Sequence, residues 1–110
     1  MLKVVFGGQS LLLTGDIEKS VENKLVLSGF DIDSDFLKIA HHGSKTSTTD
    51  DFLNSVTPKV AFIQVGASNR YGHPSLEVTE RLEKKLIPYY RTDIDGVIEL
   101  IIGNGNYFIK

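Results

Sequence analysis

The sequence predicts a single α/β domain in which strands and helices alternate along 110 residues. Two observations support this class. Short apolar runs of strand length alternate with segments of helical periodicity. The run Lys59–Val65 consists mostly of residue types that favour burial, as a central parallel strand requires. The expected order is β-β-α-β-α-β-α-β-β-β, in one domain over residues 1–110.

The first elements are two strands and a helix. Leu2–Phe6 and Ser10–Thr14 are apolar runs, and the Gly7-Gly8 pair between them predicts a hairpin turn. Apolar residues that recur every four positions predict a helix over Ile17–Leu27. Asp16 is the expected N-cap of this helix and Gly29 its C-terminal stop.

The middle of the chain predicts a strand over Phe36–Ala40 and a short helix through Val56. Two capping-box spacings, Ser47/Asp50 and Thr48/Asp51, indicate where this helix begins, and Pro58 indicates where it ends. After the strand at Lys59–Val65, Pro74 is typical of the first turn of a helix, here running to about Leu86. The remaining predicted elements are strands over Tyr89–Arg91, Val97–Ile102 and Tyr107–Ile109, the last two joined by an Asn-Gly turn.

Composition narrows the class of function. Twelve basic and fourteen acidic residues give a net charge of −2, so an anionic substrate must be attracted by metal ions or a local patch. The absence of cysteine excludes disulfides, thiolate metal sites and thiol catalysis. No apolar stretch approaches the roughly 20 residues that span a bilayer, and no signal peptide is visible. A soluble domain is therefore expected.

Polar residues follow four of the predicted strands. Parallel strands in α/β sheets bring their carboxyl ends, where ligands bind, to one edge. The residues at these four ends are Asp16; His41, His42 and Ser44; Asn69, Arg70 and His73; and Asp93. We therefore expect one site at this edge.

Each group also has a purely structural interpretation. Asp16 is either only a helix cap or also a bridge between metal ions. His41 and His42 are either loop residues that cap a helix or a metal and acid–base pair. Successive side chains of a strand point opposite ways, so only one of them enters the site unless the backbone turns at Gly43.

The same holds for the later groups. Asn69 and Arg70 are either loop residues or donors to phosphate, and His73 is either a helix cap or a ligand or proton donor. Ser44 is either a solvated loop residue or a phosphate contact. Asp93 belongs to a turn, or orients a histidine from behind the site.

Four motifs together resemble the metallo-β-lactamase-like domain of the ComEC family, the competence proteins of bacterial DNA uptake. They occur in one order and span nearly all of the chain: Leu-Leu-Leu-Thr-Gly-Asp-Ile-Glu (11–18), Leu-Lys-Ile-Ala-His-His-Gly-Ser-Lys-Thr-Ser (37–47), Asn-Arg-Tyr-Gly-His-Pro (69–74) and Tyr-Arg-Thr-Asp-x-Asp-Gly (90–96). The resemblance implies half of an αββα sandwich and metal-dependent hydrolysis of phosphodiesters. The expected substrate is single-stranded DNA.

The resemblance also implies roles for individual residues. The metal ligands are Asp16 and His41 or His42, and the ions are Zn²⁺ or Mn²⁺. His42 and His73 are the expected catalytic residues, Ser44, Asn69 and Arg70 contact substrate, and Asp93 supports the site from behind.

One departure from the family limits this prediction. The first metal motif of the superfamily, His-x-His/Asp-x-Asp-His, lies before Thr-Gly-Asp, whereas the only three histidines here follow Asp16. The chain thus resembles the C-terminal portion of the domain, and by itself is expected to be inactive and to self-associate through its uncovered sheet. The expected partners are the missing N-terminal half and, in a parent protein of the bacterial inner membrane, single-stranded DNA. The alternative is a degenerate, non-catalytic module that binds DNA or protein.

Overall fold

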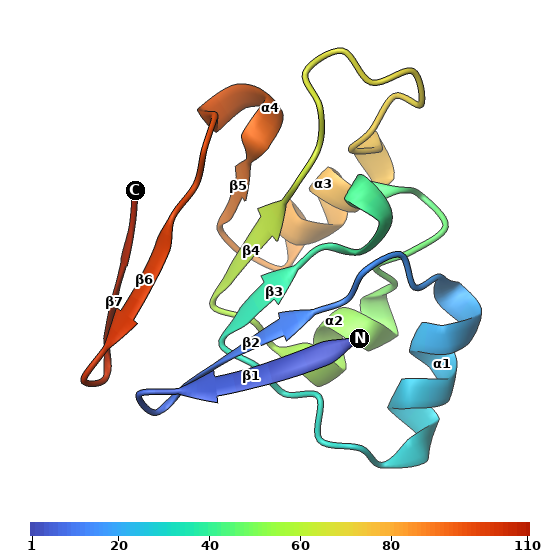
Figure 1. Ribbon diagram of the computed structural model, residues 1–110. Coiled ribbons are helices and arrows are strands. Elements are labelled where there is room, and N and C mark those ends of the chain that lie inside the picture. The colour runs from blue at the N-terminus through green and yellow to red at the C-terminus, as the bar shows by residue number, and fades with distance from the viewer.

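The computed structural model describes residues 1–110 as a five-stranded mixed sheet with a separate two-stranded hairpin (Figure 1). The strands are β1 (Leu2–Phe6), β2 (Gln9–Leu13), β3 (Phe36–Lys38), β4 (Val60–Ile63), β5 (Tyr89–Arg91), β6 (Leu100–Gly103) and β7 (Asn106–Ile109). The helices are α1 (Lys19–Ser28), α2 (Asp50–Val56), α3 (Leu76–Lys84) and α4 (Thr92–Asp95), with a 3₁₀ turn η1 (Ala40–Gly43). The predicted α/β class is confirmed, and the predicted order holds with η1 and α4 added.

The sheet has the strand order β1-β2-β3-β4-β5. The β1–β2 pair is antiparallel, and β2 to β5 pair in parallel. Because each parallel strand lies beside the previous one, right-handed crossovers place α1, α2 and α3 on one face of the sheet. Figure 1 shows these helices on the side of the sheet away from the β6–β7 hairpin. The carboxyl ends of β2, β3, β4 and β5 consequently lie along one edge.

The hydrophobic core lies between the sheet and the three crossover helices. Leu12, Leu37 and Ala61 share a register across β2, β3 and β4, and each is fully buried. Phe52 of α2 and Leu82 of α3 join the same cluster from the helix side. None of the helices combines the length and the hydropathy that a bilayer-crossing segment needs.

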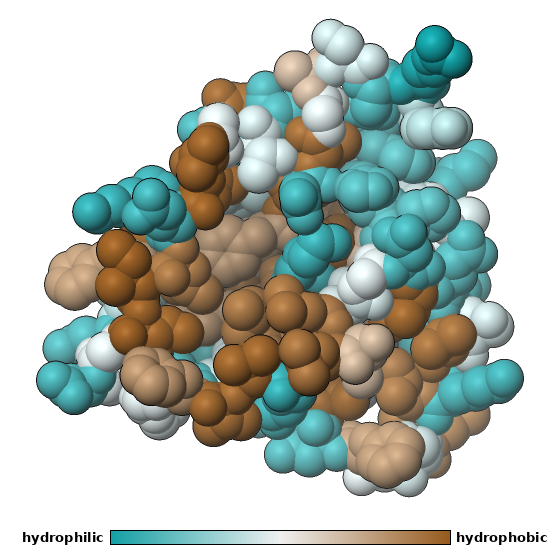
Figure 2. Space-filling view, in the orientation of Figure 1, coloured by the Kyte–Doolittle hydropathy of each residue, from teal (hydrophilic) through white to brown (hydrophobic).

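The opposite face of the sheet is also apolar but only partly covered. The β6–β7 hairpin lies against it, where the Tyr107 ring meets Phe36 edge-on with centroids 4.9 Å apart. Nearer the β1 edge, Leu2 and Phe6 are 59% and 64% exposed. Figure 2 shows the apolar residues gathered over this side of the sheet and the hairpin.

Two predicted helix caps are wrong. Asp16 does not cap α1, which begins after Glu18 and has no side-chain cap. Ser47 and Thr48 do not cap α2, because the Thr49 hydroxyl accepts the bond from Phe52 N. The Ser47 hydroxyl donates instead to Ile17 O, at 2.7 Å. A tertiary contact has thus taken up Ser47, and the local cap of α2 lies at Thr49.

The start of α3 also differs from the prediction. Pro74 lies before the helix, and Ser75 is the N-cap, with its side chain accepting from Val78 N. Ser75 N in turn donates to Gly43 O, at 2.8 Å. This bond joins the segment after β4 to the segment after β3.

Candidate functional site

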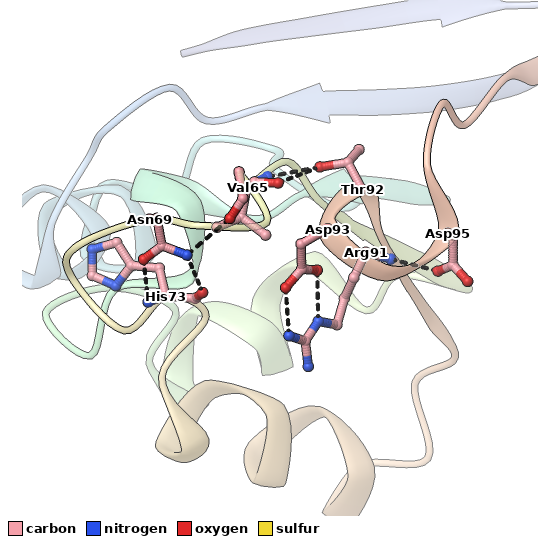
Figure 3. Close-up of polar contacts among 8 residues, drawn as sticks. Val65, Asn69, His73, Arg91, Thr92, Asp93 and Asp95 are labelled. Carbon is pink, nitrogen blue, oxygen red and sulfur yellow. Dashed lines mark hydrogen bonds and ion pairs between the residues drawn. The ribbon is translucent and has the colours of Figure 1, made fainter.

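The loops that carry the predicted site residues meet at the carboxyl edge of the parallel strands. His41 N donates to Gly15 O at 2.9 Å, which joins the loop after β3 to the loop after β2. The Ser75–Gly43 bond joins the loop after β3 to the loop after β4. Thr92, after β5, bonds through its hydroxyl to both Val65 N and Val65 O, at 2.8 and 2.9 Å (Figure 3). The four loops therefore form one connected rim.

The His41-His42 pair lies where the backbone turns. Both residues are in the left-handed region, with φ of 50° and 55°. The turn thus begins at His41, two residues before Gly43. Left-handed backbone is unfavourable for residues with a β-carbon and persists only where surrounding contacts impose it. The turn leaves the two rings 6.4 Å apart and tilted by 59°.

His41 and His73 come together from different loops. Their ring centroids are 6.0 Å apart. The Nδ1 atom of each is buried without a hydrogen-bond partner, and His41 Nδ1 lies 3.5 Å from Glu18 Oε1. Burial, followed by the charges of His41 and His42, lowers the pKa of His73 below its ordinary value. Imidazole nitrogens of this kind suit a metal ion or an ordered water.

The donor types fit a metal ion, but the number of donors does not complete a site. No group of three or more His, Cys, Asp or Glu side chains is placed to hold an ion. A catalytic zinc requires three protein ligands.

The backbone next to Asp16 is bonded to the histidine turn, but the charge of Asp16 acts on Lys38. Asp16 is exposed, and its backbone neighbour Gly15 is the one bonded to His41. Lys38 lies on the sheet, where burial lowers the pKa of its ammonium and the charge of Asp16 opposes that shift. Asp16 is thus close enough to Lys38 for its charge to be felt there.

His42 is more open than His41. Its Nδ1 lies 2.7 Å from Gln64 O, which fixes the ring against the end of β4. The residue also lines an open depression of about 550 Å³ together with Val65 and Thr92. His42 is therefore open to solvent on this side.

Asn69 closes the loop after β4 with its own side chain. Its Nδ2 donates to Gly66 O at 3.0 Å and to His73 O at 2.8 Å, and its Oδ1 accepts from His73 N at 2.8 Å (Figure 3). The amide expected to contact substrate is therefore used to hold His73. Arg70 next to it is exposed.

Ser44 is also engaged locally. It is buried, and its Oγ lies 2.9 Å from Thr46 Oγ1. Its hydroxyl shapes the turn after the histidines.

Asp93 pairs with Arg91, where an imidazole partner was expected. The guanidinium donates through Nε and Nη2 to the two carboxylate oxygens, at 3.0 and 2.7 Å (Figure 3). These bonds lower the pKa of Asp93 and raise that of Arg91. Asp93 thus anchors the turn after β5.

The buried Glu22 is a site-supporting residue that the sequence did not reveal. This α1 side chain is fully buried, and its carboxylate accepts from Thr48 N at 2.6 Å and Thr49 N at 2.9 Å. Arg81 of α3 donates to Thr48 O, at 2.6 Å. The segment that follows the histidines is therefore held from two helices. A single glutamate in a helix is usually solvated, so the pattern contained no signal for it.

Comparison with known proteins gives long matches to parts of larger chains. The chain is 43% identical over 93 residues to ComE operon protein 3 of Bacillus subtilis, covering 84% of this chain and 12% of that protein. It is 40% identical over 106 residues to Competence protein ComA of Neisseria gonorrhoeae, covering 96% of this chain and 15% of that protein. It is 36% identical over 94 residues to Recombination protein 2 of Haemophilus influenzae, covering 86% of this chain and 12% of that protein. No family model matches the chain.

Proposed function

We propose that this chain contributes part of a metal-dependent phosphodiester hydrolase domain with a role in DNA uptake. The proposal starts from the homologues, whose names support a competence-protein family. The chain spans only 12% to 15% of the length of these relatives, so activity is assigned to a longer protein that contains it. The expected substrate is single-stranded DNA. By the same resemblance, the parent protein belongs to the bacterial inner membrane.

One observation carries the proposal. His41 and His73 approach from separate loops, each with a buried Nδ1 that has no hydrogen bond, and His42 lies beside them. The Glu18 carboxylate lies 3.5 Å from the His41 Nδ1, outside hydrogen-bond geometry. Purely structural histidines normally satisfy their buried nitrogens within the protein. Unsatisfied nitrogens at the carboxyl edge of an α/β sheet favour a ligand-binding role.

The residues then divide into three roles. Asp16 and one of His41 and His42 would hold Zn²⁺ or Mn²⁺ together with donors from outside these 110 residues. When bound, such an ion lowers the pKa of water and neutralises charge at phosphorus. The other histidine of the pair, expected to be His42, moves protons at the phosphate together with His73, and Arg70 binds a phosphate oxygen. Asn69, Ser44 and Asp93 hold the loops in position.

The partly covered face of the sheet supports the proposed half-sandwich. An apolar sheet face of this kind is stable only when another layer covers it. In the parent protein, the proposed cover is the N-terminal half of the same αββα domain. In the chain alone, the cover is a second copy.

A non-catalytic binding module is the second candidate. The observation that favours it is the incomplete ligand set. Such a module would bind DNA or protein at the same rim without metal.

The two functions separate in one set of measurements. We expect the 110-residue chain to bind Zn²⁺ or Mn²⁺ weakly in calorimetry and to cleave no DNA. A longer protein that includes the rest of the domain should cleave single-stranded DNA, and a chelator should stop it. Robust chelator-sensitive cleavage by the chain alone would show that its ligand set suffices.

Variants of the longer protein test the individual residues. Asp16→Ala should abolish cleavage, His41→Ala and His42→Ala should be severe but unequal, and His73→Ala should be milder. Asp31→Ala is the matched control, since that carboxylate is 81% exposed and belongs to another loop. Full activity of Asp16→Ala would reject the hydrolase. DNA binding by the longer protein with no cleavage even when Zn²⁺ or Mn²⁺ is supplied would favour the module.

A further inference from the structure

Tyr71 is an aromatic side chain that the fold does not use. It is 80% exposed, more than Phe30 at 71% or Phe108 at 67%. An aromatic ring that buries so little contributes little to stability. A single exposed ring is common on protein surfaces, so its exposure alone does not indicate a role.

The contact between Tyr71 and His73 connects this exposed ring to the candidate site. The Tyr71 ring stacks on His73, with centroids 5.7 Å apart and an interplanar angle of 22°. His73 lies 6.0 Å from His41. Two successive ring contacts therefore connect the exposed Tyr71 to His73 and His73 to His41. Because Tyr71 is mostly exposed while stacked on one side, its other face is open.

The loop that carries Tyr71 is held in position. The side-chain amide of Asn69 bonds to both backbone groups of His73, which closes the chain around Tyr71 (Figure 3 shows these bonds). A ring held in this way loses little conformational entropy when a ligand stacks on it. Arg70, the preceding residue, is exposed on the same loop.

We propose that Tyr71 is a stacking platform for one unpaired nucleobase, which places the neighbouring phosphate at the histidine cluster. The inference rests on the proposed function for its substrate class. In a duplex, both faces of each base are already stacked, whereas an unpaired base offers a free face. The platform therefore selects single strands. With a net charge of −2, the chain gains little from bulk electrostatic attraction, which makes such a contact decisive.

The test is equilibrium binding by the full 110-residue chain in the presence of a chelator. The probe is a fluorescein-labelled oligothymidine of about ten nucleotides, followed by polarisation. Tyr71→Ala and Tyr71→Leu should weaken binding about fivefold or more, because stacking on an aromatic ring is lost. Tyr71→Phe should stay within about twofold, because it keeps the ring. Phe30→Ala, the loss of an exposed ring that follows α1, should change nothing.

A second probe reports the stacking itself. An oligonucleotide with one 2-aminopurine should lose fluorescence on binding to the unmodified chain and to Tyr71→Phe, and not with Tyr71→Leu. A labelled hairpin duplex should bind all variants equally weakly. Unchanged affinity of Tyr71→Ala, equal loss in Tyr71→Phe, or no measurable binding of the single strand would each overturn the proposal. These binding measurements are made in chelator, where metal-dependent cleavage does not occur. A failure of the proposed hydrolysis would therefore leave the stacking result intact, and a failure of stacking would leave the hydrolase proposal intact.

Discussion

Gly43 and Pro74 lie so close that a β-carbon on Gly43 would sit 2.6 Å from Pro74 Cβ and 2.9 Å from its Cα. Gly43 also has a φ of +83°, which residues with a side chain rarely adopt. The two residues join the histidine turn to the His73 loop. Only glycine at this position permits the approach.

Gly43→Ala should therefore destabilise the fold and separate the two loops. We expect a loss of about 2 to 4 kcal/mol in urea unfolding, since backbone strain and overpacking add. Gly29→Ala is the control, because its φ is +78° but nothing lies within 4 Å of the added carbon. It should lose only about 1 kcal/mol. Equal losses in the two variants would show that the contact with Pro74 contributes nothing.

Glu22→Gln should loosen the segment that follows the histidines. An amide presents one oxygen and one NH₂ group, so one of the Thr48 and Thr49 N–H donors would face another donor. The expected loss is about 1 to 3 kcal/mol in the free energy of unfolding. Hydrogen exchange at these two amides should accelerate as well. Glu80→Gln, on the exposed side of α3, should leave both measurements unchanged.

Asp93→Asn should lower stability in a pH-dependent way. The bonds from Arg91 hold the pKa of Asp93 below 3.8 in the folded chain. A lowered carboxyl pKa gives stability that is present above the unfolded value and is lost as pH falls through the folded value. The variant should therefore lose about 1 to 3 kcal/mol at pH 7, and the difference should shrink below about pH 4. A constant difference across this range would contradict the charge pairing.

The uncovered sheet face should make the chain self-associate. Sedimentation velocity should show a species larger than the monomer as concentration rises. Val4→Lys places a charge among the exposed residues of β1 and should favour the monomer. Leu27→Lys, on α1 and 86% exposed, is the matched control and should not. A monomer at high concentration that binds no apolar dye would contradict the prediction.

Local patterns predicted most of the fold. The Asn104-Gly105 pair forms the expected hairpin turn, with φ of 48° and 79°, because two consecutive positive φ angles demand these residue types. Gly29 ends α1 with a φ of 78°, also as predicted. The helix starts were wrong where a tertiary bond replaced the cap, as with Ser47 and Ile17.

The site was less predictable than the fold, because tertiary bonds decide which of its side chains are engaged. Strand order indicated which residues share an edge, but not which of them are already engaged. The expected roles of Asn69 toward the substrate and of Asp93 toward a histidine stay predictions, and the structure adds that Asn69 bonds to His73 and Asp93 to Arg91. The left-handed backbone of His41 and His42 likewise depends on contacts from other loops, which no local pattern contains.

Residues 46–49, which follow the histidine turn, are attached to α1 and to the residues just before it. Two links reach α1 itself, from Lys19 N to Thr46 O and from the Thr48 and Thr49 amides to the Glu22 carboxylate. A third joins Ser47 Oγ to Ile17 O, just before the helix. Partners 26 to 30 positions apart cannot meet until α1 has docked on the sheet. A fluctuation that releases α1 therefore frees residues 46–49 in one cooperative event, while His41, His42 and Gly43 keep their bonds to the loops after β2 and β4.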